Sequence, residues 1–172
     1  MVKIMMKQIN NLFMVMLAVA SAVILSSCSD DDNDITSAPE VIQTAFNSQY
    51  PDATNVDWEL TNGYYEVDFY YSGTHSEWSM TFTRVEAEAW YTSSGSWVKT
   101  YFDVTNLYNA SSSILPSAVL TAIANYASSN SLSVDDVEIV DLPSGDTDYF
   151  QVEYDSAKTD VYVNFDFSGE QI

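Results

Sequence analysis

The chain has 172 residues, with 25 acidic side chains, five basic ones and a net charge of −20 at pH 7. This charge excludes binding to nucleic acid or anionic lipid head groups through a basic patch, because both would be repelled. The single cysteine, Cys28, excludes an intrachain disulfide. A folded domain must therefore depend on its apolar core, for which 47% of the residues are hydrophobic.

Two lysines, Lys3 and Lys7, precede an apolar run over residues 12–25 and then small residues that lead to Cys28. This order is typical of a secretory signal peptide, and the apolar run is shorter than the about 20 residues of a membrane-spanning helix. The residues before and at Cys28, Leu-Ser-Ser-Cys, resemble the lipobox of bacterial lipoproteins. The resemblance implies a signal peptide over residues 1–27 and a lipid anchor on Cys28. An ordinary cleaved signal with a free cysteine is the alternative.

The segment that follows the cysteine is acidic and polar. All 25 acidic residues lie after Cys28, together with only three of the five basic ones. Residues 28–38 lack apolar periodicity, so they are predicted to form a disordered tether. Acidic residues directly after a lipidated cysteine resemble the surface-export signal of lipoproteins in one Gram-negative phylum. The implied location is the bacterial outer membrane with exposure at the cell surface, and a periplasm-facing lipoprotein is the alternative.

The folded domain is predicted to span residues 39–172 and to contain two repeats, over 39–104 and 115–172. Each repeat opens with a proline and then places apolar residues at positions i, i+3 and i+4, which predicts a helix with one buried face. The apolar positions are Ile42, Ala45 and Phe46 in the first repeat and Val119, Ala122 and Ile123 in the second. The first helix should end before Tyr50, because Tyr50 precedes a proline.

Each predicted helix is followed by alternating patterns that indicate half-buried antiparallel strands. The clearest pair is 65–69 and 150–154, where aromatic, polar, valine, acidic and aromatic residues follow in the same order. The other matching pairs are the strands 56–60 and 137–140 and the glycine turns at Gly95 and Gly169. The repeated unit is therefore one helix with three or four antiparallel strands.

The first repeat contains an insertion. The two copies are offset by 85 residues at the second strand but by 74 at the glycine turn, so the first copy carries 11 extra residues. Trp78, Met80 and Phe82 share one parity. The other parity is shared by Val85, Ala87, Ala89 and Tyr91. This change of phase predicts a bulge or bend near Thr83 and Arg84, either in a long kinked strand or in an additional hairpin.

These residues resemble the PepSY-like domain of exported bacterial proteins, which is also described as beta-lactamase-inhibitor-like. The resemblance covers nearly all of residues 39–172. It implies an α+β fold in which two tandem helix-plus-three/four-strand repeats form one antiparallel sheet with both helices on one face. The namesake inhibitor holds its enzyme with the uncovered side of such a sheet. The residues that carry the resemblance include Tyr50-Pro51-Asp52-Ala53, Trp58-Glu59, 65–69, Gly95-Ser96-Trp97 and Leu115-Pro116.

Strand parity predicts which side chains occupy the uncovered side of the sheet. The candidate binding residues there are Glu66, Asp68, Trp90, Gln151, Glu153, Tyr162, Asn164 and Asp166. Carboxylates beside aromatic rings are typical of interface anchors. We therefore expect either a simply solvated sheet face or a docking face for a basic or sugar-bearing partner.

The chain shows no motif for catalysis or cofactor binding. His75 is the single histidine and lies in a turn-like segment, so it is interpreted as a polar loop residue, and a zinc site lacks ligands. A nucleophile elbow and a phosphate-binding glycine loop are absent. We expect no enzyme activity, no cofactor and no metal. Weak calcium binding at 135–136 or 146–148 is less expected than loop solvation.

Two functions follow. The first is an exported, lipid-anchored, non-enzymatic binding module that engages or inhibits an envelope protein or peptidase through the uncovered side of the sheet. The alternative is a carbohydrate-facing or adhesive surface lipoprotein that uses exposed tryptophan and tyrosine side chains. The expected partners are the membrane, through lipidated Cys28, and a protein or peptide, but no nucleic acid.

Overall fold

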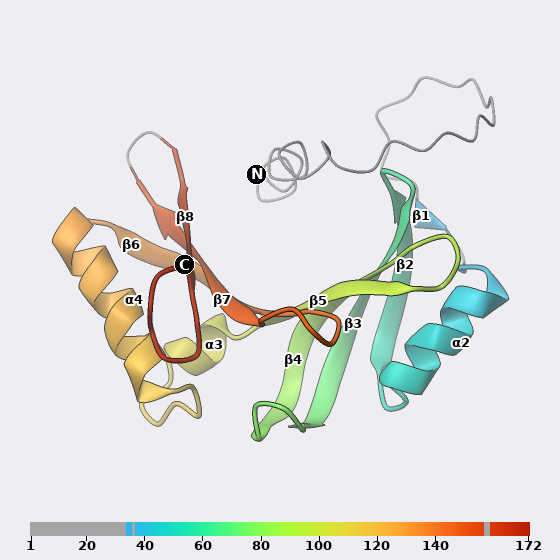
Figure 1. Cartoon of the computed structure of the whole chain (residues 1–172), viewed down its shortest axis with the longest axis horizontal. Coiled ribbons are helices and arrows are strands. Elements are labelled where there is room, and N and C mark those ends of the chain that lie inside the picture. The colour runs from blue at the N-terminus through green and yellow to red at the C-terminus, as the bar shows by residue number, and fades with distance from the viewer. Residues whose placement is uncertain (1–33, 36, 157–158) are drawn as a thin grey trace. The chain divides into compact units, whose positions relative to one another are not determined.

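The computed structural model describes residues 34–35, 37–156 and 159–172. Its strands form one antiparallel sheet in which each strand lies beside its neighbours in the sequence, from β1 to β8 (Figure 1). Cys28, the predicted signal peptide and the predicted lipid anchor lie outside the described residues. Within the described part of the chain, no helix is long and apolar enough to cross a membrane.

The first repeat contains one helix and four strands. They are α2 (Glu40–Gln49), β2 (Thr54–Thr61), β3 (Tyr64–His75), β4 (Met80–Tyr91) and β5 (Trp97–Asp103). A two-residue strand, β1 (Asp34–Ile35), pairs with β2 at the edge of the sheet. The sheet therefore begins inside the segment that the sequence predicts to be a tether.

The second repeat contains one helix and three strands. They are α4 (Ser117–Asn130), β6 (Ser133–Asp141), β7 (Tyr149–Asp155) and β8 (Val161–Phe165). A single helical turn that the sequence did not predict, α3 (Thr105–Tyr108), lies in the connection. Both long helices begin directly after a proline, and α2 ends before Tyr50, so the predicted helix boundaries are confirmed.

Both helices cover the same face of the sheet, which we call the helix face. The Phe46 ring of α2 lies 5.5 Å from Trp58 and 5.0 Å from Phe69. On α4, the Tyr126 ring lies 5.0 Å from Tyr154, whose hydroxyl donates to the Ile123 carbonyl at 3.3 Å. Strand register places Phe69 and Tyr154 on the same side of the sheet. The predicted architecture is confirmed, and the opposite side is the open face.

The glycine turns show that the two repeats are structural copies. Gly95 and Gly169 both have φ of +84°, and each donates its N–H to the carbonyl three residues earlier at 2.9 Å. A Cβ atom at Gly95 would lie 3.2 Å from the Val41 carbonyl oxygen, and one at Gly169 would lie 2.7 Å from that of Ala118. Val41 and Ala118 are the second residues of the two helices. The same turn therefore packs on the same helical position twice.

The inserted residues lengthen the β3–β4 hairpin, and Arg84 forms the predicted bulge. The register shifts between Tyr71 and Gly73, and Arg84 opposite them has φ of 53° and donates its N–H to Ser72 Oγ at 3.0 Å. This shift explains the change of apolar phase. Phe82 before the bulge and alternate residues after it, Val85, Ala87, Ala89 and Tyr91, are all buried on the helix face.

The tip of this hairpin, residues 75–80, contacts the second repeat, and in Figure 1 it lies between α4 and α2. The Trp78 ring lies 5.6 Å from Phe102 and 5.7 Å from Phe167. Trp78 Nε1 donates to Asp148 Oδ2 at 2.9 Å. The insertion therefore contributes to the core that the two repeats share.

Candidate functional site

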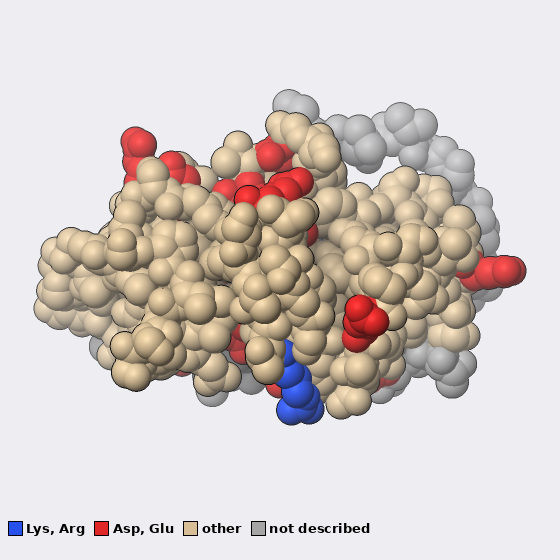
Figure 2. Space-filling view, turned by 90° about the horizontal axis from the view of Figure 1, so that it is seen from below, with Lys and Arg blue, Asp and Glu red and all other residues tan. Residues whose placement is uncertain are grey.

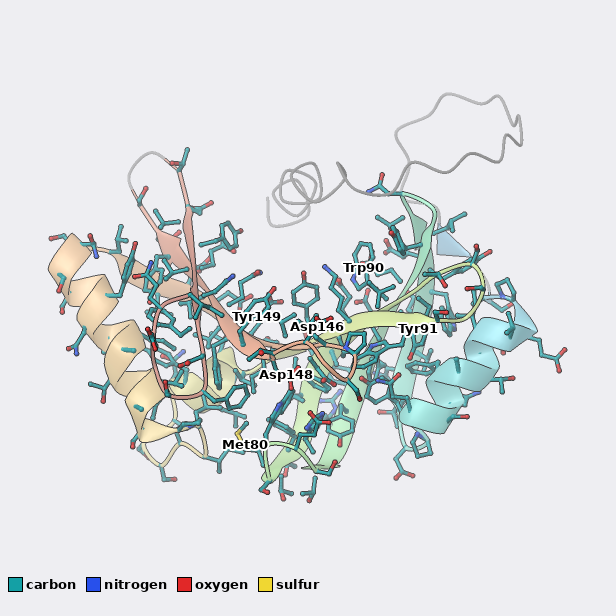
Figure 3. All side chains as sticks on the ribbon, viewed as in Figure 1. Met80, Trp90, Tyr91, Asp146, Asp148 and Tyr149 are labelled. Carbon is teal, nitrogen blue, oxygen red and sulfur yellow. The ribbon has the colours of Figure 1, made fainter. Side chains whose placement is uncertain are left out.

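The open face carries rows of polar and aromatic side chains that cross the sheet from strand to strand. Figure 3 labels two of them, Trp90 on β4 and Tyr149 on β7. Register gives four rows: Glu59, Glu66, Trp90 and Lys99; Asp57, Asp68, Glu88 and Tyr101; Glu138, Gln151 and Asn164; Asp136, Glu153 and Tyr162. Seven of the eight predicted binding residues belong to these rows.

Asp166, the eighth predicted residue, follows the end of β8 and belongs to the glycine turn. Its Oδ1 accepts hydrogen bonds from the Ser168 N–H at 2.8 Å, the Ser168 hydroxyl at 2.7 Å and the Glu170 N–H at 2.8 Å. The bond from the Ser168 hydroxyl, together with that from Glu170, holds the pKa of Asp166 below its usual range. Because Asp166 follows the end of β8, strand alternation no longer fixes the side of this carboxylate, and its place on the open face stays a prediction.

Several predicted residues are buried although they lie on the open face. Glu66 is 9%, Trp90 is 5% and Glu153 is 7% exposed. All four tryptophans lie in the described part of the chain, and each is buried or half-buried, so the expectation of exposed tryptophans was wrong. Long side chains cause this burial: the Trp90 ring lies 6.1 Å from the Tyr64 ring and 5.0 Å from Lys99 Nζ.

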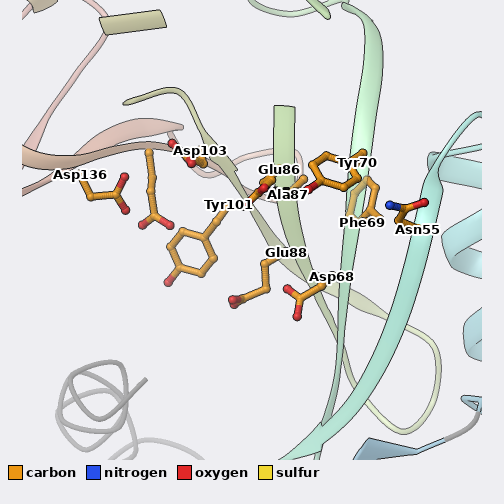
Figure 4. A pocket seen from close by; sticks show the side chains of 11 residues that line it. Asn55, Asp68, Phe69, Tyr70, Glu86, Ala87, Glu88, Tyr101, Asp103 and Asp136 are labelled. Atoms are coloured by element: carbon orange, nitrogen blue, oxygen red, sulfur yellow. Dashed lines mark hydrogen bonds between the residues drawn. The ribbon is translucent and has the colours of Figure 1, made fainter. Parts of the chain in front are cut away.

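A hollow in the open face, with a volume of about 450 Å³, forms what we call the acidic pocket (Figure 4). Of the residues that line it, six are acidic and none is basic. The lining residues are Asn55, Asp68, Phe69, Tyr70, Glu86, Ala87, Glu88, Tyr101, Asp103, Asp136 and Glu138. Figure 4 shows that Asp68, Glu88 and Tyr101 project to the same side of the strands.

Lys99 lies on the open face next to the acidic pocket. Its Nζ lies 4.3 Å from the Tyr101 ring centroid and donates to the Tyr101 hydroxyl at 2.5 Å. Burial lowers the pKa of Lys99, and the negative charges of Glu88, Glu138 and Glu66 oppose that effect. The ammonium group is thus held by two aromatic rings and by nearby carboxylates.

Crowding changes the protonation of the carboxyl groups in and beside the pocket. Burial, with repulsion from Asp136 and Asp103, raises the pKa of Glu138 to about 8. Burial also raises the pKa of Glu88 to about 7, although Trp90 donates a hydrogen bond to this carboxylate and partly opposes the change. Desolvation disfavours the charged form, and neighbouring negative charges add to that effect. A fraction of these groups is therefore protonated at neutral pH.

The chain matches the family described as beta-lactamase-inhibitor-like, PepSY-like over residues 26–85 and 77–172. The chain belongs to this family. The family model matches twice, and the second match begins within the β3–β4 hairpin and continues through the second repeat. Such a domain is consistent with a non-enzymatic binding module. No curated protein matches the chain.

Solved structures share the PepSY-like fold. A BLIP-like protein from Bacteroides fragilis is 28% identical, with a TM-score of 0.62 over 80% of this chain and 85% of that one. A DUF2874 family protein from Bacteroides uniformis is 25% identical, with a TM-score of 0.60 over 78% of this chain and 86% of that one. Another from Bacteroides ovatus, 21% identical with a TM-score of 0.62 over 79% and 85%, shows the fold alone.

Three carboxylates of this PepSY-like domain approach closely enough to share a cation. One oxygen from each of Glu66, Asp68 and Glu88 lies within 4.8 Å of the others. Calcium takes six to eight oxygen ligands, so these side chains would supply part of a shell. The sequence did not suggest this group, because it forms only when β3 pairs Asp68 with Glu88 and Glu66 with Trp90.

His75 lies on the helix face and is not part of the pocket. Its ring stacks on Trp78 at 3.6 Å, its Nε2 lies 3.2 Å from Asp141 Oδ2, and its buried Nδ1 lacks a hydrogen-bond partner among the described residues. The sequence interpretation as a polar loop residue therefore missed a partly buried pair. Asp141 lies 66 positions away, so only the fold of the long hairpin brings the two together.

The acidic side chains are unevenly distributed over the surface. Seen from below the view of Figure 1, the molecule shows a mostly uncharged surface with separate acidic groups and little basic surface (Figure 2). Six acidic side chains lie together around the hollow of the open face. We take the open face as the candidate functional site.

Proposed function

We propose that this protein is a lipid-anchored, non-enzymatic binding module that engages a protein of the cell envelope, such as a peptidase, through its open face. The main observation is a sheet face that none of the described helices covers and that combines carboxylates with aromatic rings. Such faces supply rigid anchors for a partner. The BLIP-like name of a structural relative supports the same mode of action.

We further propose that lipidated Cys28 fixes the domain to the outer membrane and that the protein is displayed at the cell surface. The support is the lipobox-like sequence and the acidic residues after it. Metabolic labelling with a clickable fatty acid should mark the protein, and Cys28→Ser should abolish the label. Protease digestion of intact cells should remove the domain if it faces outward and spare it if it faces the periplasm.

The binding function is tested by capture from envelope extract with variants on the two faces. Asn164→Lys places a bulky cation on the open face, and Ala124→Lys places one on the exposed side of α4 as the matched control. We expect a partner that the wild type and the control retain and that Asn164→Lys loses, with binding weakened by salt. A partner lost equally from both variants, or retained by both, would overturn the proposed role of the open face.

The carbohydrate alternative has one supporting observation, the partly exposed Tyr64 ring beside Trp90. A glycan array separates the two functions. Binding to a sugar that resists high salt and disappears in Tyr64→Ser would favour the alternative, whereas a salt-sensitive protein partner favours the binding module.

A further inference from the structure

We propose that the acidic pocket receives the cationic end of a lysine or arginine side chain from the protein that binds the open face. This inference rests on the proposed function and names the chemistry of the partner's anchor. It draws on the composition of the pocket, its size and the way in which the chain already holds its own cations there.

Charge and volume both suit a cationic side chain. Six carboxyl groups from four strands converge on the hollow, and none of its described lining residues is basic. A volume of about 450 Å³ corresponds to about fifteen water molecules at roughly 30 Å³ each, which accommodates one long side chain with some of its water. The residues that line the pocket come from both repeats. A partner that binds across the open face would therefore contact the pocket.

Two of the three aromatic rings in the pocket lining, Tyr70 and Tyr101, already hold cations from this chain. The Arg84 guanidinium lies 4.0 Å from the Tyr70 ring centroid. Lys99 Nζ lies 4.3 Å from the Tyr101 ring centroid. Cation–π contacts of this kind strengthen when water is removed. The open face thus shows, with its own side chains, how it binds an ammonium or guanidinium group, and the acidic pocket lies between these rings.

Proton release gives this binding a distinctive signature. Burial raises the pKa of Glu138 to about 8, so an arriving cation favours its charged form and drives a proton off. The charged groups that face Glu138 are Glu88 on β4, Lys99 and Asp103 on β5, Asp136 on its own strand β6 and Glu153 on β7. Affinity should therefore rise from pH 6 to pH 9, because the competing protons are lost.

The test uses a blocked pentapeptide with one central lysine, and the same peptide with acetyl-lysine as the uncharged match. Both are titrated into the ¹⁵N-labelled full-length protein in neutral detergent. We expect shifts of the amide signals of Glu88, Tyr101 and Glu138 with the lysine peptide and none with the acetylated one. Equal responses to the two peptides, or no response, would overturn the proposal.

Matched variants separate the pocket from general attraction to an acidic protein. Glu88→Gln/Glu138→Gln removes two pocket charges, and Glu40→Gln/Asp52→Asn removes two from exposed positions on and after α2. We expect the pocket pair to weaken peptide binding at least fivefold and to abolish its pH dependence, and the control pair to change it less than twofold. Equal weakening would overturn the proposal, and circular dichroism checks that each variant is folded.

Two further experiments identify what binds in the acidic pocket. They also separate failure of the pocket proposal from failure of the proposed function. If calcium chloride shifts the same signals and excludes the peptide, the pocket is a metal site and the proposal fails. If the captured partner is lost with Asn164→Lys but binds Glu88→Gln/Glu138→Gln normally, the open face remains the docking site and only the pocket inference fails. If no partner depends on the open face, the proposed function fails instead.

Discussion

Two carboxyl groups on the open face should lower the free energy of unfolding as the pH rises, which is the reverse of the usual effect of a carboxylate. Because burial raises the pKa of Glu138 to about 8, the folded chain binds this proton more tightly than the unfolded chain does. Its stabilising contribution is fully present below about pH 4.5 and is lost as the pH rises through about 8. The same holds for Glu88, whose pKa is about 7. Protonation, not ionisation, of these side chains favours the fold.

Glu138→Gln should therefore stabilise the domain at pH 9 and leave it nearly unchanged at pH 5. Since one pKa unit corresponds to about 1.4 kcal/mol and this half-buried group is partly screened, we expect a gain of about 1–2 kcal/mol at pH 9. Thermal melts at both pH values measure it, with Glu40→Gln as the exposed control. A gain that is the same at pH 5 and pH 9 would contradict the assignment.

Three glycines share one value of φ but differ in the contacts that an added Cβ atom would make. Comparing them separates the cost of steric contact from the cost of the backbone conformation. Gly63, Gly95 and Gly169 all have φ of +84°, but a Cβ atom would meet nothing within 4 Å at Gly63, the Val41 carbonyl at 3.2 Å at Gly95 and the Ala118 carbonyl at 2.7 Å at Gly169. Substitution by alanine should cost about 1 kcal/mol at Gly63, more at Gly95 and about 3 kcal/mol at Gly169. Urea denaturation gives the order, and equal costs at all three would show that the helix contacts do not matter.

At the scale of elements, the hairpin tip is stabilised by one aromatic side chain. Trp78 stacks on His75 and donates to Asp148. Trp78→Ala should cost about 3 kcal/mol through lost burial, and Trp78→Phe about 1 kcal/mol through the lost hydrogen bond. The exposed neighbour Glu77→Ala should stay within about 0.5 kcal/mol. If Trp78→Ala behaves like Glu77→Ala in chemical denaturation, the tip does not contribute to the shared core.

Local patterns in the sequence predict the elements but not the distant contacts between them. Alternation in 65–69 and 150–154 gives the strands and the side on which each residue lies, and the phase change gives the bulge at Arg84. Alternation cannot predict how exposed a side chain is, because exposure depends on the side chains of the neighbouring strands. The burial of Trp90 was therefore missed. It also cannot pair His75 with Asp141, because that contact depends on how the long hairpin folds over the sheet.

At the scale of the whole described domain, the two repeats share one sheet and one core. Strand β5 of the first repeat pairs with β6 of the second, with Thr100 opposite Asp141 and Phe102 opposite Ile139. Apart from Trp90 and Val140, the buried apolar residues of both repeats form a single cluster. A core that crosses the boundary in this way should make the two copies unfold together.

This cooperativity has a convenient test, because all four tryptophans lie in the first repeat. Tryptophan fluorescence in a urea titration therefore reports on the first repeat, and hydrogen exchange of the β7 amides reports on the second. We expect one common midpoint. Two midpoints separated by more than the error of the fits would show that the repeats are independent folding units.

The hairpin tip also suggests how a duplicated scaffold of this kind could acquire new uses. Trimming residues 75–80 would remove Trp78 from Phe102 and Phe167. It would also take away the His75 contact of Asp141 and the Trp78 hydrogen bond of Asp148. An apolar cavity that contains the carboxylates of Asp141 and Asp148 would open on the helix face of the sheet. Changing the length of a single hairpin would thus replace a filled interior with a cavity and leave the residues of the open face unchanged.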